Sequence, residues 1–177
     1  GKADGFTVFV KDAVIGDTVT AKIMKAKKNY GYGRLMEILK PSPYRVDPIC
    51  PSARQCGGCQ LQAVSYEEQK AFKEKKLRGH LERIGGFKEL PMEPLSGMDE
   101  PYHYRNKAQF PVGRNKEGRI VTGFYAGRTH AIIENRDCAL GIPQNKEVLD
   151  RVIAHMEKYN IAPYDEMTGK GLVRHIF

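Results

Sequence analysis

The chain has 177 residues, of which 41% are hydrophobic and 28% are charged, and its formal net charge at pH 7 is +8. This length is enough for one large or two small domains with hydrophobic cores, and no apolar run is long enough to span a membrane. A basic protein favours a polyanionic partner, although positive charge can also serve solubility alone. We therefore expect a cytoplasmic monomer with no membrane contact.

Residues 1–48 are rich in predicted strands. The turn Asp4-Gly5 precedes an alternating apolar run, which is a hairpin signal. The predicted strands are Phe6–Val10, a second strand that follows a turn within Val14–Ile23, and Gly33–Lys40. Pro41 and Pro43 end the third strand. Short strands at this spacing, with a basic turn, predict a small OB-like β-barrel, which is a common nucleic-acid-binding form.

Residues 49–62 contain three of the four cysteines of the chain, in the pattern C-x5-C-x2-C, and the fourth lies far downstream. The candidate metal ligands are Cys50, Cys56, Cys59 and Cys138. Three thiolates on one loop and one remote thiolate suit a 4Fe–4S cluster, whose ligands surround a bulky body. Gly57 and Gly58 allow a tight bend and leave backbone amides open to the cluster.

Two other uses of the cysteines remain as alternatives. Structural zinc usually shows two C-x2-4-C pairs, and only Cys56 and Cys59 form such a pair. A disulfide framework is weaker still, because nothing resembles a secretion signal and the chain does not need covalent links to fold.

Residues 63–86 predict a helix. Ser65 and Glu68 form a capping box at its start, and Gly85-Gly86 closes it. Leu77, Leu81 and Ile84 recur at helical spacing and predict one apolar face.

Residues 87–177 predict a second β-rich domain that supplies the fourth cysteine. The predicted strands are Tyr104–Val112, Arg119–Tyr125 and Ala131–Ile133. A helix begins near Pro143, and its expected apolar face consists of Val148, Leu149, Val152, Ile153 and Met156. The predicted fold class is therefore α+β and β-rich, with an OB-like barrel followed by an antiparallel β region and flanking helices.

Three segments together resemble one enzyme family. They are Pro41–Pro51, the run CGGCQLQ at Cys56–Gln62, and the pattern Y-x-x-Q-x-x-F-K at Tyr66–Lys73. They resemble the RNA uracil-5-methyltransferases, and in particular the branch that modifies 23S ribosomal RNA. In that branch a TRAM domain, an OB-like RNA-binding barrel, precedes four cluster cysteines in this same order. Residues 4–17 resemble a TRAM domain whose first strand is missing, and residues 123–138 resemble the central domain.

The resemblance implies S-adenosylmethionine as the methyl donor, bound in a separate Rossmann-like domain. There a cysteine nucleophile and a glutamate base would act on the uracil ring. The chain opens on Gly1 and stops inside an apolar stretch, so we expect a fragment that is truncated at both ends. All four cysteines are assigned to the cluster, so we expect the fragment alone to be inactive. The glycines from Gly123 to Gly127 lie on a predicted hairpin and do not indicate a dinucleotide site.

The task expected of the fragment is RNA recognition. Cations contact phosphates, and exposed aromatic rings stack on unpaired bases. The candidate RNA-binding residues are Lys22, Lys25, Lys27, Lys28, Tyr30, Arg34, Arg105, Lys107 and Arg128. The alternative for Tyr30 and Tyr32 is a place in the barrel core. Alternatives for the whole chain are a tRNA uridine methyltransferase, or a stand-alone RNA-binding module with a structural four-cysteine site for iron–sulfur or zinc.

Overall fold

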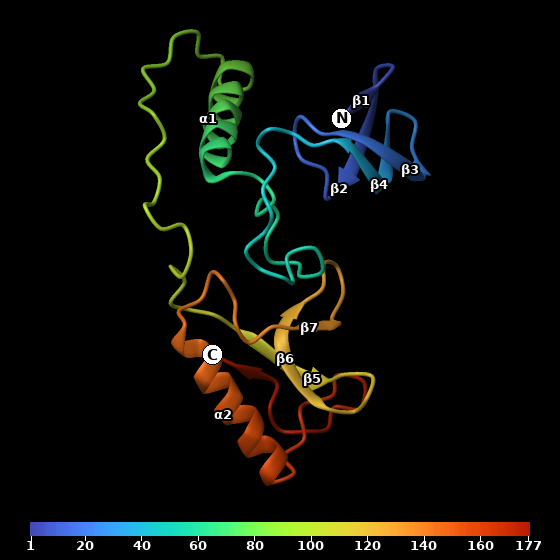
Figure 1. Cartoon of the computed structure of the whole chain (residues 1–177), viewed down its shortest axis with the longest axis vertical. Helices are drawn as coiled ribbons and strands as arrows, with labels where there is room; N and C mark the ends of the chain where they lie inside the picture. Colours follow the sequence, from blue (N-terminus) through green and yellow to red (C-terminus); the bar gives the residue numbers. More distant parts are fainter. The chain divides into compact units, whose positions relative to one another are not determined.

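The structure, a computed structural model, describes all of residues 1–177 and divides them into two units. The first unit is Gly1–Asp47 with Leu61–Ser96, and the second is Pro48–Gln60 with Gly97–Phe177. Each unit contains a four-stranded sheet and one helix (Figure 1). The predicted α+β, β-rich class is confirmed.

The sheet of the first unit is open. Its strands are β1 (Lys2–Ala3), β2 (Phe6–Lys11), β3 (Thr18–Ala26) and β4 (Tyr30–Lys40), in the order β1-β2-β4-β3. The predicted hairpin is confirmed: Asp4 and Gly5 have positive φ angles of 48° and 80° and join the antiparallel strands β1 and β2. β2 and β4 are parallel, whereas β3 and β4 are antiparallel. The predicted OB-like barrel is not closed, because the edge strands β1 and β3 do not pair and β1 has only two residues.

Two glycines of β4 allow the strands of this sheet to pack closely. A Cβ atom at Gly33 would lie 3.2 to 3.4 Å from the side chains of Val10, Val8 and Ala21, and one at Gly31 would lie 3.1 Å from the ring of Phe6. Both glycines are buried. Side chains alternate along a strand, so the neighbours of these glycines on β4 lie on the opposite face.

A buried ion pair connects the turn before β3 to the chain after β4. The Asp17 side chain has 0% exposure and accepts hydrogen bonds from Arg45 Nε at 3.1 Å and from Arg45 Nη2. It also accepts the backbone N–H groups of Val14 at 2.7 Å and Ser42 at 2.8 Å. The hydrogen bonds from Arg45 hold the pKa of Asp17 well below its usual range; burial opposes this shift, and the two backbone amides add to it.

The helix α1 (Tyr66–Arg83) has the predicted extent but not the predicted cap. Ser65 is the N-cap residue, and its side chain makes no capping hydrogen bond. Its backbone amide donates to Tyr44 O at 2.9 Å, so the amide that Glu68 would have accepted is already used. The predicted capping box is therefore wrong, because a tertiary contact replaces the local one.

The predicted apolar face of α1 is not buried. Leu77 is 49% exposed and Ile84 is 82% exposed, and no residue of the helix is buried. The N-terminal end of α1 is instead connected to the preceding segment by Gln69, whose Nε2 donates to the carbonyl groups of Leu61 at 3.1 Å and Val64 at 2.9 Å.

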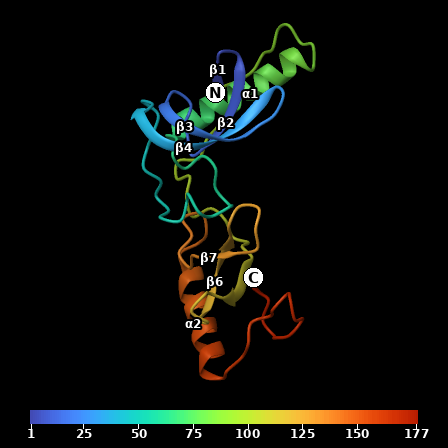
Figure 2. The same cartoon turned by 90° about the vertical axis from the view of Figure 1, so that its right-hand side faces the viewer.

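The second unit has one helix packed on an antiparallel sheet (Figure 2). Its elements are β5 (Phe110–Arg114), β6 (Ile120–Tyr125), β7 (Ile132–Glu134), α2 (Gln144–Lys158) and β8 (His175–Ile176), and the strand order is β7-β6-β5-β8. The core consists of Val112, Ile120, Ile153 and Met156. None of the helices is both long enough and apolar enough to cross a membrane.

Three details of the second unit differ from the sequence prediction. The strand expected from Tyr104 begins only at Phe110. Val148 was expected on the buried face of α2 and is 51% exposed, whereas Leu149 is buried. β8 was not predicted, because a two-residue strand at the end of the chain is defined only by its pairing with β5.

The substitution Asp17→Asn should destabilise the first unit by about 3 kcal/mol at pH 7, since it leaves a largely buried guanidinium without its carboxylate. Hydrogen exchange of the β2–β4 amides would measure this loss. The folded-state pKa of Asp17 lies below the unfolded value of about 3.9. The stabilisation should therefore be complete above about pH 4 and decline as the pH falls further.

The matched control is Asp4→Asn, which removes the same charge from an exposed turn residue of the same unit. Its exchange rates should equal those of the unsubstituted chain, because asparagine also tolerates a positive φ angle. Equal exchange in both variants would show that the ion pair contributes nothing to stability.

Candidate functional site

Three aromatic rings lie together on one face of the first sheet. Phe9 and Tyr32 are opposite each other in the β2–β4 pairing. The ring centroids of Phe9, Tyr30 and Tyr32 are separated by 5.7 to 5.9 Å. Phe9 is 55% exposed, Tyr32 is 41% exposed, and Tyr30 is partly buried. We call these three residues the aromatic face.

The sequence left open whether Tyr30 and Tyr32 lie in the core or are exposed, and the structure answers this for Tyr32. Tyr32 is not a core residue, and the buried positions beside it are Gly31 and Gly33. Phe9 was missed as a candidate, because the sequence does not show that β2 pairs with β4 rather than with β3. The only sequence signal for Phe9 was the alternation along β2, which places its side chain on the other face of the sheet from Val8 and Val10.

The predicted basic residues of the first unit flank the aromatic face. Lys22 is paired with Arg34, and Lys25 is paired with Tyr32. Directly paired residues point to the same side of a sheet, so these cations share the side of the rings. Lys27 and Lys28 follow in the turn between β3 and β4, and all five cations are exposed.

The predicted basic residues of the second unit lie on separate loops. Arg105 forms an isolated bridge with Gly141, ahead of β5. Lys107 follows it, and Arg128 lies between β6 and β7 with a φ angle of 63°. All three are exposed. The structure therefore does not place them on one element, in contrast to the cations around the aromatic face.

All four cysteines belong to the second unit, and the loop that carries three of them contacts the β6–β7 turn. Cys56 forms a bridge with Ala126, and Gly57 N donates to Tyr125 O at 3.0 Å. A Cβ atom at Gly57 would lie 3.0 Å from Tyr125 O and 3.1 Å from Gly127 Cα. A side chain at position 57 would therefore crowd the backbone of the β6–β7 turn, and glycine allows this close contact.

Two of the thiols accept hydrogen bonds from amides. Cys50 is 7% exposed, and its Sγ accepts a hydrogen bond from Asn135 Nδ2 at 3.5 Å. Cys56 Sγ accepts one from the Gly58 backbone N–H at 3.4 Å. Such N–H···S contacts are typical around thiolates that ligate metals, since they offset the negative charge on sulfur.

The segments that carry the first and the fourth cysteines line one pocket. Cys50 lines a pocket of about 590 Å³ together with Asp137 and Ala139, the two chain neighbours of Cys138. All four cysteines are thiols and not disulfides. No three side chains of His, Cys, Asp or Glu are grouped closely enough to hold a single metal ion. The structure thus brings the two cysteine-bearing segments into one unit without arranging their ligands around one ion.

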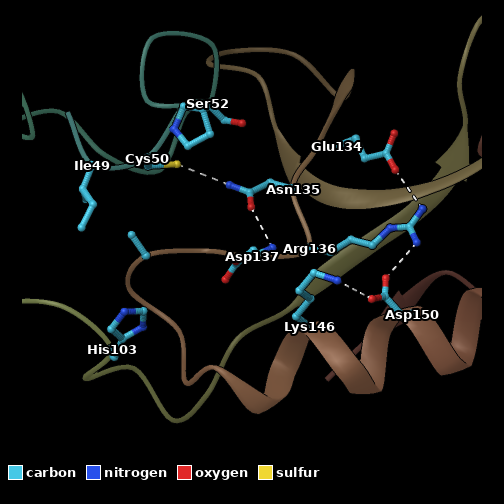
Figure 3. Close-up of a pocket in the computed structure, with 12 residues that line it drawn as sticks. Ile49, Cys50, Ser52, His103, Glu134, Asn135, Arg136, Asp137, Lys146 and Asp150 are labelled. Carbon is cyan, nitrogen blue, oxygen red and sulfur yellow. Dashed lines mark hydrogen bonds and ion pairs between the residues drawn. The ribbon is translucent and has the colours of Figure 1, made fainter. Parts of the chain in front are cut away.

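An ion-pair network lines the same pocket (Figure 3). Arg136 donates to Glu134 at 2.8 Å and to Asp150 at 3.0 Å, and Lys146 donates to Asp150 at 2.7 Å. Burial lowers the pKa of Arg136, but its hydrogen bonds to Asp150 and Glu134 outweigh this and raise it. Lys146 and then Arg136 lower the pKa of Asp150. The Lys146–Asp150 pair has the i,i+4 spacing of a helix and could have been found in the sequence. The Arg136–Asp150 contact could not, because it joins the end of β7 to α2.

The two histidines of the predicted β region do not contact the cysteines through any identified bond. His103 Nδ1 lies 2.8 Å from Gly141 O. His130 Nδ1 lies 2.7 Å from Glu166 Oε2, and this contact, followed by that of Arg174, lowers the pKa of Glu166.

Comparison with known proteins gives consistent results along the whole chain. Residues 1–36 match the TRAM domain family. A Bacillus cereus protein described as an uncharacterized RNA methyltransferase is 44% identical over 175 residues, which cover 99% of this chain and 38% of that protein. A Clostridium tetani protein with the same description is 43% identical over 176 residues, with the same coverage. The chain carries a TRAM domain and is homologous to proteins named RNA methyltransferases.

A solved structure shares the fold. The crystal structure of Pyrococcus abyssi tRNA (uracil-54, C5)-methyltransferase in complex with S-adenosyl-L-homocysteine matches with a TM-score of 0.65 and 23% identity, over 95% of this chain and 37% of that chain. The curated relatives and the TRAM match confirm the resemblance inferred from the sequence at the level of RNA methyltransferases. The chain spans about 38% of the length of the curated relatives it matches.

The substitution Gly57→Ala should loosen the cysteine loop, because the added methyl group is too close to the backbone of Tyr125 and Gly127. A cost of about 1–3 kcal/mol is expected from such crowding. Hydrogen exchange of the Gly57 amide should accelerate. Gly127→Ala is the control, since a Cβ atom there would meet only Gly57 Cα at 3.9 Å. Equal exchange in the two variants would contradict the close contact.

Proposed function

We propose that the chain is the RNA-recognition and iron–sulfur part of an S-adenosylmethionine-dependent uridine-5-methyltransferase that acts on 23S ribosomal RNA. The proposal of RNA binding rests on the aromatic face and its flanking cations. They lie on the sheet formed largely by the residues that match the TRAM family. Methyl transfer itself we assign to the portion of such an enzyme that these 177 residues do not represent, since the relatives are much longer. The Pyrococcus abyssi enzyme, which was crystallised with S-adenosyl-L-homocysteine, supports the choice of methyl donor.

The aromatic face is suited to unpaired nucleotides. Its rings are partly exposed and meet in T-shaped or tilted pairs, so a base can stack on Phe9 or Tyr32 without displacing a core residue. Stacking needs a base that is splayed out of a helix, which favours loops and single strands over duplex RNA. The nearby lysines and arginine would contact the phosphates of the same strand.

The cysteines are proposed to hold a 4Fe–4S cluster with a structural role. The residues fit this group in their chemistry: four thiols occur in one unit, and two of them accept amide hydrogen bonds. A cluster would supply a rigid link between the loop at Cys50–Cys59 and the segment at Cys138. Structural zinc usually shows two C-x2-4-C pairs, and only Cys56 and Cys59 form such a pair in this chain.

RNA binding should depend on the aromatic face. Phe9→Ala and Tyr32→Ala should each weaken binding of a fluorescent 23S ribosomal RNA hairpin about tenfold, because one base–aromatic stack contributes about 1–3 kcal/mol. Fluorescence anisotropy measures the change. Phe87→Ala is the matched control, because Phe87 is also 55% exposed and belongs to the same unit.

The same titration tests the RNA class. Affinity for the ribosomal hairpin should decrease as salt increases, since phosphate neutralisation releases counterions. It should exceed the affinity for a tRNA T-loop hairpin and for a duplex of equal length. Stronger binding to the T-loop would favour a tRNA substrate, and binding that is unaffected by salt would contradict the role of the cations.

The metal proposal is tested by anaerobic purification. The chain should be brown and contain iron and inorganic sulfide, and Cys56→Ser should lose most of both and become less soluble. Metal analysis and visible absorption measure these outcomes. A colourless protein that contains stoichiometric zinc would overturn the iron–sulfur assignment. A soluble Cys56→Ser variant that loses only RNA binding would overturn the structural role.

A further inference from the structure

Asn135 is held on both sides so that its side-chain NH2 group faces Cys50 (Figure 3). Its backbone N–H donates to Thr122 O at 3.2 Å, and Thr122 is completely buried. Its Oδ1 accepts the Asp137 N–H at 3.1 Å. Since the oxygen end is occupied by a donor, the end that lies 3.5 Å from Cys50 Sγ is the NH2 group. The contact is therefore an N–H···S hydrogen bond with a fixed direction.

Gly123 is the reason why Asn135 can occupy this position. A Cβ atom at Gly123 would lie 2.1 Å from Ile133 O and 2.5 Å from Asn135 N. Both contacts are far shorter than atoms allow, so any side chain there would displace the end of β7. The glycine that the sequence placed on a hairpin thus has a packing role, and Asn135 depends on it.

We propose that Asn135 is a positioning residue of the metal centre, which donates a hydrogen bond to the Cys50 thiolate and retains the cluster. This inference rests on the proposed iron–sulfur cluster. A thiolate that is almost completely buried cannot be solvated by water, so a protein donor must offset its charge. Hydrogen bonds to cluster sulfurs also favour the more negative, reduced state and raise the reduction potential.

Two substitutions separate the hydrogen bond from general charge effects. Asn135→Leu removes the donor without adding charge, and Asn135→Asp keeps the acceptor for Asp137 but replaces the donor with an anion. The control is Asn115→Asp, because Asn115 Oδ1 also accepts the N–H of the residue two positions later, Glu117, at 3.1 Å. It belongs to the β5–β6 turn and has no identified contact with a cysteine.

The 177-residue chain is reconstituted anaerobically with ferrous iron and sulfide and titrated with dithionite, which supplies one electron per cluster. Both Asn135 variants should shift the reduction equilibrium about tenfold toward the oxidised state, which is ~59 mV for one electron. They should also bleach several-fold faster in air. The Asn115→Asp variant should match the unsubstituted chain in both measurements.

Three outcomes would overturn the inference. Potentials and bleaching rates of the Asn135 variants equal to those of Asn115→Asp would remove the role of Asn135 and leave the cluster in place. A shift in Asn135→Asp alone would assign the effect to charge and not to the N–H···S bond. An unsubstituted chain that takes up no iron and sulfide would overturn the cluster itself, and the role of Asn135 with it.

Discussion

The buried ion pair between Asp17 and Arg45 fixes the place where the cysteine loop leaves the first unit. Arg45 also donates to Asp12 O, so one side chain joins the turn before β3 to the end of the strand region. Directly beside it the chain returns: Val46 N donates to Ala63 O at 3.1 Å, and Ser65 N donates to Tyr44 O at 2.9 Å. The two ends of the intervening segment are therefore held together, although the segment itself belongs to the other unit.

Local signals predicted much of the fold. The Asp4-Gly5 hairpin and both helices were predicted from turn residues, periodicity and breakers, and these depend on neighbours in the sequence. The errors arose where a distant segment competed with a local one. The backbone amide of Ser65 donates to Tyr44 O and does not take part in a capping box. The apolar residues of α1 are not buried against any other element. The open sheet likewise follows from strand pairing, which the strand sequences do not specify.

The candidate sites show the same division. The spacing of the cysteines and the basic residues of the barrel segment were visible in the sequence. Phe9 was not, because its place beside Tyr32 requires the parallel pairing of β2 and β4. Asn135 was not, because its contact with Cys50 joins residues that are 85 positions apart. Candidate ligands and RNA-binding cations can be identified from the sequence. The residues that orient them depend on tertiary contacts, which close packing at glycines such as Gly57 and Gly123 allows.

Two cations that line the pocket beside Cys50 are paired with carboxylates, and a neutral amide contacts the sulfur. Arg136 is the chain neighbour of Asn135 and is the nearest cation in sequence, but Glu134 and Asp150 occupy its guanidinium group. Lys146 is likewise directed to Asp150. The cations of this pocket are thus balanced by carboxylates, and the buried thiol receives a donor that carries no net charge. Such a donor offsets charge on sulfur without competing for the thiolate as an ion-pair partner, which leaves the sulfur available as a metal ligand.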